Sequence, residues 1–272
     1  MKATTFLAAL LAVALPGSAQ SPMPEAAEIA GEPRAPTDRG ASTNKGFYLE
    51  GWKKLVPDLL SDQKRIWLFP AAAARGRHLT PALAVAGTTA ALVALDPYGG
   101  RHFQRTDSFG GFNRVFSGYN TARGMILFPT ALYAVGLLQK DAYAQQTYVL
   151  AAEAILDSEI LTSVMKDVTR RLNPGLVPPG GDFSATWFRK KNGSWIRGIG
   201  SFPSGHTIAA FSVATVYARR YPHPAWRRWA AYGLAGVVGF SRVSLERHFV
   251  SDVFAGAALG YFIARDVVLR RP

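Results

Sequence analysis

Apolar and polar positions alternate along this chain in blocks of helical length. From about Gly46 onward, apolar stretches are separated by polar connections, and turn dipeptides flanked by alternating residues, as in β-hairpins, are missing. The pattern predicts an all-α fold, a helical bundle. The predicted helices are Gly51–Leu60, Thr80–Leu95, Thr121–Gln139, Ala142–Arg171, Ser204–Arg220, Pro224–Phe240 and Ser251–Arg270.

The N-terminal residues do not follow this pattern. Lys2 precedes the apolar run Phe6–Leu15, and small residues lead up to Ala19, which is typical of a cleaved signal peptide over residues 1–19. The alternative is an N-terminal anchor, for which the run is short. We therefore expect an exported protein, periplasmic or otherwise extracytoplasmic, with a membrane location as the alternative.

The rest of the chain divides by composition. Residues 20–45 are rich in Pro, Ala, Gly, Ser and charge, which predicts a flexible linker. We expect an N-terminal helical region over residues 46–120 and the functional core over residues 121–272.

Two apolar stretches raise the question of a membrane. Leu79–Leu95 and Gly124–Gln139 carry no charge, but both fall short of the roughly 20 residues that a spanning helix needs. The other predicted helices are shorter or contain ionisable residues, which are costly at the centre of a bilayer. The sequence favours a soluble bundle with a buried core rich in Ala and Gly, and a membrane-embedded bundle is the alternative.

Composition narrows the chemistry. The chain has no cysteine, which excludes disulfides, zinc thiolate sites and cysteine nucleophiles. Its net charge of +13 is spread along the chain without nucleic-acid-binding motifs, so no nucleic-acid partner is expected. Anionic substrates or anionic lipid headgroups are the partners that this charge favours. The oligomeric state is left open.

Three short segments carry candidate catalytic residues, and the last contains Ser241, Arg242, His248 and Asp252. If Ser251 caps a helix, a carboxylate at Asp252 lies four residues beyond the His248 imidazole. It could then accept the Nδ1 proton and leave Nε2 free to attack. Arg242 would offer several donors to phosphate oxygens. A structural His–Asp pair explains the same spacing.

The middle segment runs Pro203-Ser204-Gly205-His206 and opens an apolar helix. Backbone N–H groups at a helix start favour an anion, and glycine permits its close approach. The Ser204 hydroxyl could cap the helix or donate to phosphate, and His206 could protonate a leaving group. An ordinary helix start with a structural histidine is the alternative.

The first segment contains Lys166, Arg170, Arg171 and Asn173-Pro174 at a predicted helix end. Cations there either complement the helix dipole or form a phosphate clamp. The connection that follows, Pro174–Phe202, holds aromatic residues and the cations Arg189 and Arg197. A connection of this length predicts a binding loop or a solvated surface insertion.

The motifs taken together are more specific evidence for a function than any one of them alone. Pro203 to His206, followed by Ser241, Arg242, His248 and Asp252 in that order, resembles the type 2 phosphatidic acid phosphatase (PAP2) superfamily. This superfamily also contains bacterial non-specific acid phosphatases and vanadium haloperoxidases. The resemblance covers roughly Thr121 to Asp266 and implies a helical bundle of that type.

The resemblance also implies a mechanism. His248 would attack phosphorus and form a phosphohistidine, while His206 protonates the departing alkoxide and Asp252 supports His248. Lys166, Arg242, Ser204 and Gly205 would hold the phosphate oxygens. No metal or other cofactor is expected, although vanadate could bind as an inhibitor or serve as the cofactor of a haloperoxidase.

The family's first motif is Lys-x6-Arg-Pro, and in this chain its arginine is replaced by Asn173. Asn173 can donate to a phosphate oxygen but brings no charge, so we expect weaker phosphate binding unless Arg170, Arg171, Arg189 or Arg197 compensates. The first expectation is a phosphatase of small phosphomonoesters. The alternatives are a lipid phosphate phosphatase at a membrane, a haloperoxidase and an inactive phosphate-binding helical domain.

Overall fold

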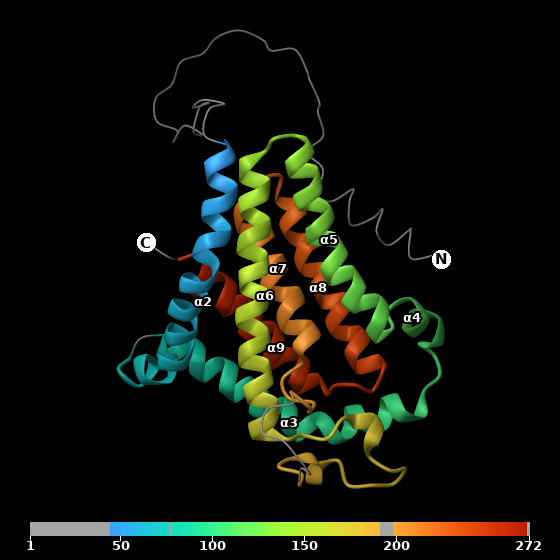
Figure 1. The fold of residues 1–272 in the computed structure, drawn as a ribbon. Helices are drawn as coiled ribbons and strands as arrows, with labels where there is room; N and C mark the ends of the chain where they lie inside the picture. The colour runs from blue at the N-terminus through green and yellow to red at the C-terminus, as the bar shows by residue number, and fades with distance from the viewer. Residues whose placement is uncertain (1–43, 77, 191–197, 271–272) are drawn as a thin grey trace, which may run out of the picture.

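A computed structural model of the chain describes residues 44–76, 78–190 and 198–270. Throughout these ranges the regular elements are helical, which confirms the all-α prediction (Figure 1). The α-helices are α2 (Asn44–Ala74), α3 (Leu79–Arg105), α4 (Gly110–Val115), α5 (Gly118–Leu138), α6 (Ala142–Thr169), α7 (Gly205–Arg220), α8 (Ala225–Ser244) and α9 (Val250–Phe262). The π-helical segment η3 (Ile263–Val268) continues α9, and two short 3₁₀ turns, η1 (Pro174–Leu176) and η2 (Ser184–Thr186), lie between α6 and α7.

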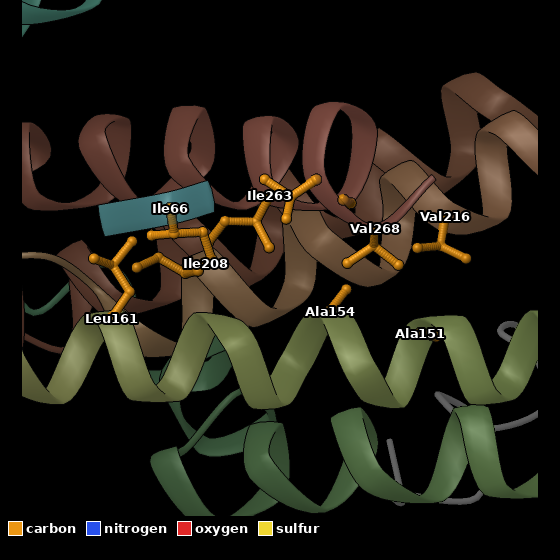
Figure 2. Close-up of a cluster of buried hydrophobic side chains, with 10 residues drawn as sticks. Ile66, Ala151, Ala154, Leu161, Ile208, Val216, Ile263 and Val268 are labelled. Carbon is orange, nitrogen blue, oxygen red and sulfur yellow. The ribbon is translucent and has the colours of Figure 1, made fainter. Parts of the chain in front are cut away.

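The main core lies where α6, α7, η3 and α2 meet. Figure 2 shows this cluster, in which small side chains on α6 face branched side chains from the other elements. Its buried members are Ile66, Ala151, Ala154, Leu161, Ile208, Val216, Ile263, Ala264, Val267 and Val268. A second cluster between α7 and α8 consists mainly of alanines, as the Ala-rich sequence of both helices predicts.

Glycines let α9 approach α7 closely. A Cβ at Gly260 would lie 2.3 Å from the carbonyl oxygen of Ile208, and a Cβ at Gly256 would lie 2.9 Å from the carbonyl oxygen of Ser204. Any side chain at either position would collide with the α7 backbone. The contact brings the start of α9 beside the start of α7, where the backbone N–H of Ser204 donates to the carbonyl oxygen of Asp252 at 3.1 Å.

Two predicted helices extend beyond their expected ends. Helix α2 continues past Leu60 to Ala74 and contains Pro57 and Pro70, while α3 continues past Leu95 to Arg105 and contains Pro97. A proline in a helix interior removes one backbone hydrogen bond, which the neighbouring turns of these long helices tolerate. The predicted signal peptide (residues 1–19) and most of the predicted linker (residues 20–45) lie outside the described residues.

The expected division at residues 120 and 121 is not a structural boundary. It falls inside α5, whose first turn is capped by the Ser117 hydroxyl accepting from the backbone N–H of Asn120. Moreover, α3 packs on α9 at the lower end of the bundle in Figure 1. The region 46–120 therefore forms part of the same packed body as the core.

Two helices are not buried as the sequence analysis expected. Among the described residues, α3 and α5 are long and apolar enough to cross a membrane, yet only 6% and 17% of their most apolar windows are buried. On α3, Leu79, Leu83, Leu95 and Tyr98 are all exposed. A soluble bundle would bury such surface, so these exposures favour the alternative of a membrane location.

Candidate active site

The three predicted segments meet at one end of the bundle. Lys166 lies in the last turn of α6, Ser204 to His206 start α7, and His248 lies in the connection between α8 and α9. These helix ends gather at the lower end of the bundle in Figure 1, where α3 crosses. The antiparallel order of α6, α7, α8 and α9 thus brings distant residues together.

His248 is held by a backbone carbonyl. Its Nδ1 lies 2.6 Å from the carbonyl oxygen of Ser201, and the side chain is buried. A carbonyl oxygen can only accept, so Nδ1 carries the proton and Nε2 carries the lone pair. This is the tautomer that a nucleophilic Nε2 requires.

Asp252 is therefore not the direct hydrogen-bond partner of His248 Nδ1 that the spacing predicts. Its Oδ2 is 3.7 Å from His248 Nδ1, too far for a hydrogen bond. Instead, Oδ2 accepts from the Ser201 hydroxyl and from the backbone N–H of Phe249 at 2.8 Å. The carboxylate thus supports His248 through Ser201, whose carbonyl oxygen faces the imidazole.

Arg242 and Lys166 supply positive charge at the start of α7. Nη2 of Arg242 donates to the carbonyl oxygen of Phe116 at 2.5 Å and to the Thr121 hydroxyl at 2.8 Å. The Lys166 ammonium nitrogen lies 3.8 Å from where a Cβ on Gly205 would be. A bare Gly205 therefore leaves room beside Lys166, with a Glu159 carboxylate oxygen 3.9 Å from the same point, and Arg242 adds a second positive charge near His206. Two cations and the N-terminus of α7 together suit an anion.

His206 is neutral in the free protein at physiological pH. Burial lowers the pKa of its imidazole to about 4, and the neighbouring side chains of Arg242, His248 and Lys166 act in the same direction. A hydrogen bond with the backbone of Gly118 opposes them. Within the described residues its Nε2 is buried without a hydrogen-bond partner, so an anion in the site would both bind this nitrogen and raise its pKa.

The neighbouring cations respond to burial as well. Burial lowers the pKa of the Lys166 ammonium, and the carboxylates of Glu159 and Asp252 oppose that shift. Burial lowers the pKa of Arg242 to about 10, so its guanidinium stays charged at neutral pH. Both groups are desolvated before an anion arrives, which strengthens their attraction to phosphate.

Three residues expected to bind phosphate have other partners. Arg171 is buried in ion pairs with Asp96 and Asp252 at 2.6 and 2.5 Å. The Asn173 amide donates to the carbonyl oxygen of Arg247 at 2.6 Å. The Ser204 hydroxyl pairs with the Thr207 hydroxyl at 2.8 Å and caps no backbone N–H. Arg171 is thus held by two carboxylates, whereas the Asn173 amide and the Ser204 hydroxyl keep further hydrogen-bonding capacity, and their phosphate binding stays a prediction.

From the sequence, three further cations could compensate for Asn173. Arg170 is the C-cap residue of α6, Arg189 is exposed, and Arg197 lies outside the described residues. The described part of the connection Pro174–Phe202 is more than a solvated insertion, because Phe183 and Thr186 are buried. Phe183 packs its ring edge-on against Phe249, next to His248.

The sequence analysis missed four residues that shape the site. Ser201 links Asp252 to His248, Asp96 binds Arg171, and Phe116 and Thr121 anchor Arg242. Ser201 stands two residues before Pro203, and the other three are far from any motif. None forms a local pattern, so only the packing of distant helices identifies them.

Comparisons with known proteins find a family match in this part of the chain. Residues 147–270 match the family model of the PAP2 superfamily, and the match includes Lys166, His206, Arg242, His248 and Asp252. This part of the chain is therefore similar to the PAP2 superfamily, and residues 147–270 are called the PAP2 region below. The family match begins 26 residues after Thr121, the predicted start of the core, so α3 and all of α5 lie outside the PAP2 region.

Several named proteins resemble the PAP2 region. A lipid A 1-phosphatase of Porphyromonas gingivalis is 41% identical over 80 residues, which cover 26% of this chain and 18% of the relative. A phosphatidylglycerophosphatase B of Bacillus subtilis is 32% identical over 112 residues, covering 38% and 48%. A lipid A 4'-phosphatase of P. gingivalis is 26% identical over 119 residues, covering 44% and 48%.

This chain spans less than half the length of these curated relatives. Among solved structures, a transmembrane PAP2-type phosphatidylglycerolphosphate phosphatase from B. subtilis is 19% identical. That match covers 76% of this chain and 94% of the solved one, with a TM-score of 0.35.

Proposed function

We propose that this chain is a phosphatase that removes a phosphate monoester from a lipid, through a phosphohistidine on His248 and without a metal or other cofactor. The observation that carries the proposal is the hydrogen bond from His248 Nδ1 to the carbonyl oxygen of Ser201 at 2.6 Å. It leaves the lone pair on Nε2, in a site that also holds the charges of Lys166 and Arg242.

In the first step, Nε2 of His248 forms a bond to phosphorus while the bond from phosphorus to the lipid oxygen breaks. Lys166, Arg242 and the N-terminus of α7 stabilise the charge on the phosphoryl oxygens. His206 transfers a proton to the departing alkoxide. Because its pKa is about 4 in the free protein, this proton arrives with a substrate whose phosphate is singly protonated.

In the second step, water attacks phosphorus and the bond to His248 breaks. Neutral His206 takes the proton from the water, and inorganic phosphate leaves. The low pKa of His206 suits this half of the reaction, because a neutral imidazole is present to act as base.

The choice of a lipid substrate has two supports. The three relatives described above are named for the phosphatase reactions of phosphorylated lipids. In addition, α3 and α5 expose apolar surface suited to a membrane. Of the two substrate classes expected from the sequence, these observations favour the lipid. The predicted signal peptide at residues 1–19 would place the reaction outside the cytoplasm.

The test compares wild type with His248→Ala in detergent micelles, using phosphatidic acid and p-nitrophenyl phosphate. His223→Ala is the matched control, because His223 is exposed in the connection between α7 and α8, at the other end of these helices. We expect phosphate release by wild type and by the control, and none by His248→Ala. An alkaline denaturing quench with ³²P-labelled substrate should trap label on wild type. Equal activity in His248→Ala would refute the mechanism, and a strong preference for p-nitrophenyl phosphate would refute the lipid substrate.

A further inference from the structure

Asp96 lies in α3, outside the PAP2 region, yet it contacts the residues behind the nucleophile. Its Oδ2 accepts from Arg171 Nη2 at 2.6 Å and from the Ser251 hydroxyl, and its Oδ1 accepts from the backbone N–H of Ser251 at 3.2 Å. Asp96 is 2% exposed, and Ser251 is fully buried. Helix α3 thereby binds the first turn of α9, one residue before Asp252.

Arg171 connects Asp96 to Asp252. Its Nη2 binds Asp96, and its Nη1 binds Asp252 Oδ1 at 2.5 Å and the Ser251 hydroxyl at 2.8 Å. The guanidinium carbon lies 3.9 Å from the ring centre of Phe249 and 4.3 Å from that of Trp187. Aromatic faces and carboxylates thus hold the guanidinium in one plane, and a planar fork with both ends bound has a fixed orientation.

The chain of contacts ends at His248. With Oδ1 of Asp252 bound to Arg171, its Oδ2 is left to accept from Ser201, whose carbonyl oxygen in turn accepts from His248 Nδ1. A shift of Arg171 would change the direction of the Asp252 carboxylate. The change would pass through Ser201 to the imidazole, and small displacements of a nucleophile are costly to rate.

We infer that Asp96 is a positioning residue for the phosphatase reaction, which holds Arg171 so that Asp252 and Ser201 aim Nε2 of His248 at phosphorus. The inference rests on the proposed function. It adds a residue that the PAP2 region does not contain and makes α3 part of the site. Asp96 binds Arg171 and Ser251, on the side of Asp252, so we expect it to act on attack and not on phosphate binding.

The test is Asp96→Asn in the full chain, assayed in micelles with the substrate that wild type hydrolyses. Asn keeps the shape of the side chain, and Arg171 and Asp252 remain a balanced pair, so the protein can fold. We expect kcat to fall about tenfold or more, since misplacement by about an ångström can cost a hundredfold. KM and inhibition by inorganic phosphate should change less than about threefold, because the cations of the site are untouched. Asp96→Glu, which restores the charge, should recover part of kcat.

Asp157→Asn is the matched control. Asp157 is also fully buried and also accepts from a distant helix, through Gln63 at 2.8 Å. It lies nine residues before Lys166, about 13 Å along α6. We expect it to lower thermal stability and leave kcat within about twofold. If Asp96→Asn also keeps kcat within twofold, or loses kcat and phosphate affinity together, the inference is overturned.

Two further measurements keep the outcome decisive. If Asp96→Asn does not fold, Ser251→Ala removes one hydroxyl shared by Asp96 and Arg171 and should lower kcat several-fold at unchanged KM; unchanged kcat would overturn the inference.

If wild type releases no phosphate, the proposed function fails by itself. The ¹⁵N spectrum of His248, assigned with His248→Asn, then tests the positioning alone: we expect its Nδ1–H signal to shift in Asp96→Asn, and an unmoved signal would refute it.

Discussion

Ser201 forms two hydrogen bonds that no sequence motif predicted. Its backbone carbonyl accepts from His248 Nδ1, and its hydroxyl donates to Asp252 Oδ2. The first bond sets the tautomer of the imidazole, while the second fixes the peptide that carries the carbonyl. Because the two bonds use different atoms of one residue, substitution can separate them.

Ser201→Ala should keep the tautomer and lose the link to Asp252. The backbone carbonyl stays in place, so we expect a several-fold loss of kcat with little change in KM. Asp252→Asn should cost more, because it also removes the ion pair with Arg171 at 2.5 Å and leaves that cation less well paired in a buried site. Steady-state kinetics of both variants provide the measurement. A loss in Ser201→Ala as large as that in His248→Ala would contradict this division of roles.

The low pKa of His206 predicts how the rate depends on pH. Above about pH 4 the imidazole of the free protein is neutral, so the proton for the leaving group comes with the phosphate, whose second pKa is about 6. We expect kcat/KM for an alkyl phosphate to fall up to about tenfold per pH unit above roughly pH 6 to 7. An aryl phosphate with a good leaving group should show a weaker decline. A rate that increases steadily from pH 6 to pH 8 would show that His206 is not the acid.

At the scale of elements, the start of α5 holds Arg242 in place. The carbonyl oxygen of Phe116 and the hydroxyl of Thr121 both accept from Nη2, and Ser241 accepts from Nη2 and Nε. Thr121→Val removes one of these acceptors with almost no change in shape. A hydrogen bond to a charged group contributes about 1.5 to 3 kcal/mol, which is roughly 10- to 150-fold in a binding constant. Because Phe116 and Ser241 still hold the guanidinium, we expect KM to rise at the lower end of that range, about tenfold.

Thr130→Val is the control for Thr121→Val, on the same helix. The Thr130 hydroxyl donates only within α5, to the carbonyl oxygen of Ile126 at 2.8 Å, and the residue is exposed. The KM of Thr130→Val should match that of wild type. An unchanged KM in Thr121→Val would mean that Ser241 and Phe116 suffice to hold the guanidinium.

Helix packing also explains what the sequence could and could not predict. Periodicity located α5 to α9 closely, because each helix carries a regular apolar face. Local spacing also singled out His206, His248 and Arg242, which the structure places at one end of the bundle, while their roles in the reaction stay predictions. The role of Asp252 was predicted only in part, since whether His248 Nδ1 meets a carboxylate or a carbonyl depends on where the Ser201 backbone lies. Asp96 was beyond prediction, because its partners lie 75 residues or more away in the chain.

The close contact of α7 and α9 should be sensitive to one methyl group. Gly260→Ala would place a Cβ 2.3 Å from the carbonyl oxygen of Ile208, and overpacking of this kind costs about 1 to 3 kcal/mol. We expect a lower midpoint of thermal unfolding. Gly233→Ala in α8 is the control, because nothing lies within 4 Å of its Cβ and alanine favours a helix by about 1 kcal/mol. A stabilised Gly260→Ala would show that α7 and α9 can separate at this point.

At the scale of the whole molecule, the positions of the exposed apolar helices α3 and α5 relative to the site say more about function than their composition does. Helix α5 runs along the bundle, whereas α3 lies across the lower end, where the site is (Figure 1). The first half of α3 exposes Leu79 and Leu83, and its second half packs on α9 and contributes Asp96. One helix thus joins an apolar surface to the residues behind His248.

This arrangement predicts that α3 acts on lipid substrates and not on soluble ones. Leu83 is 61% exposed, so Leu83→Glu should not disturb the fold, but it places a carboxylate on the surface that would meet lipid. Burial of such a charge is unfavourable, and it repels anionic headgroups. We expect activity on phosphatidic acid in vesicles to fall several-fold, while hydrolysis of p-nitrophenyl phosphate stays within twofold. Leu83→Ala, which remains apolar, should lose far less on vesicles. Equal losses of activity on both substrates would mean that the substitution acts on the site through Asp96. Unchanged activity on both would show that lipid reaches His248 without contacting α3.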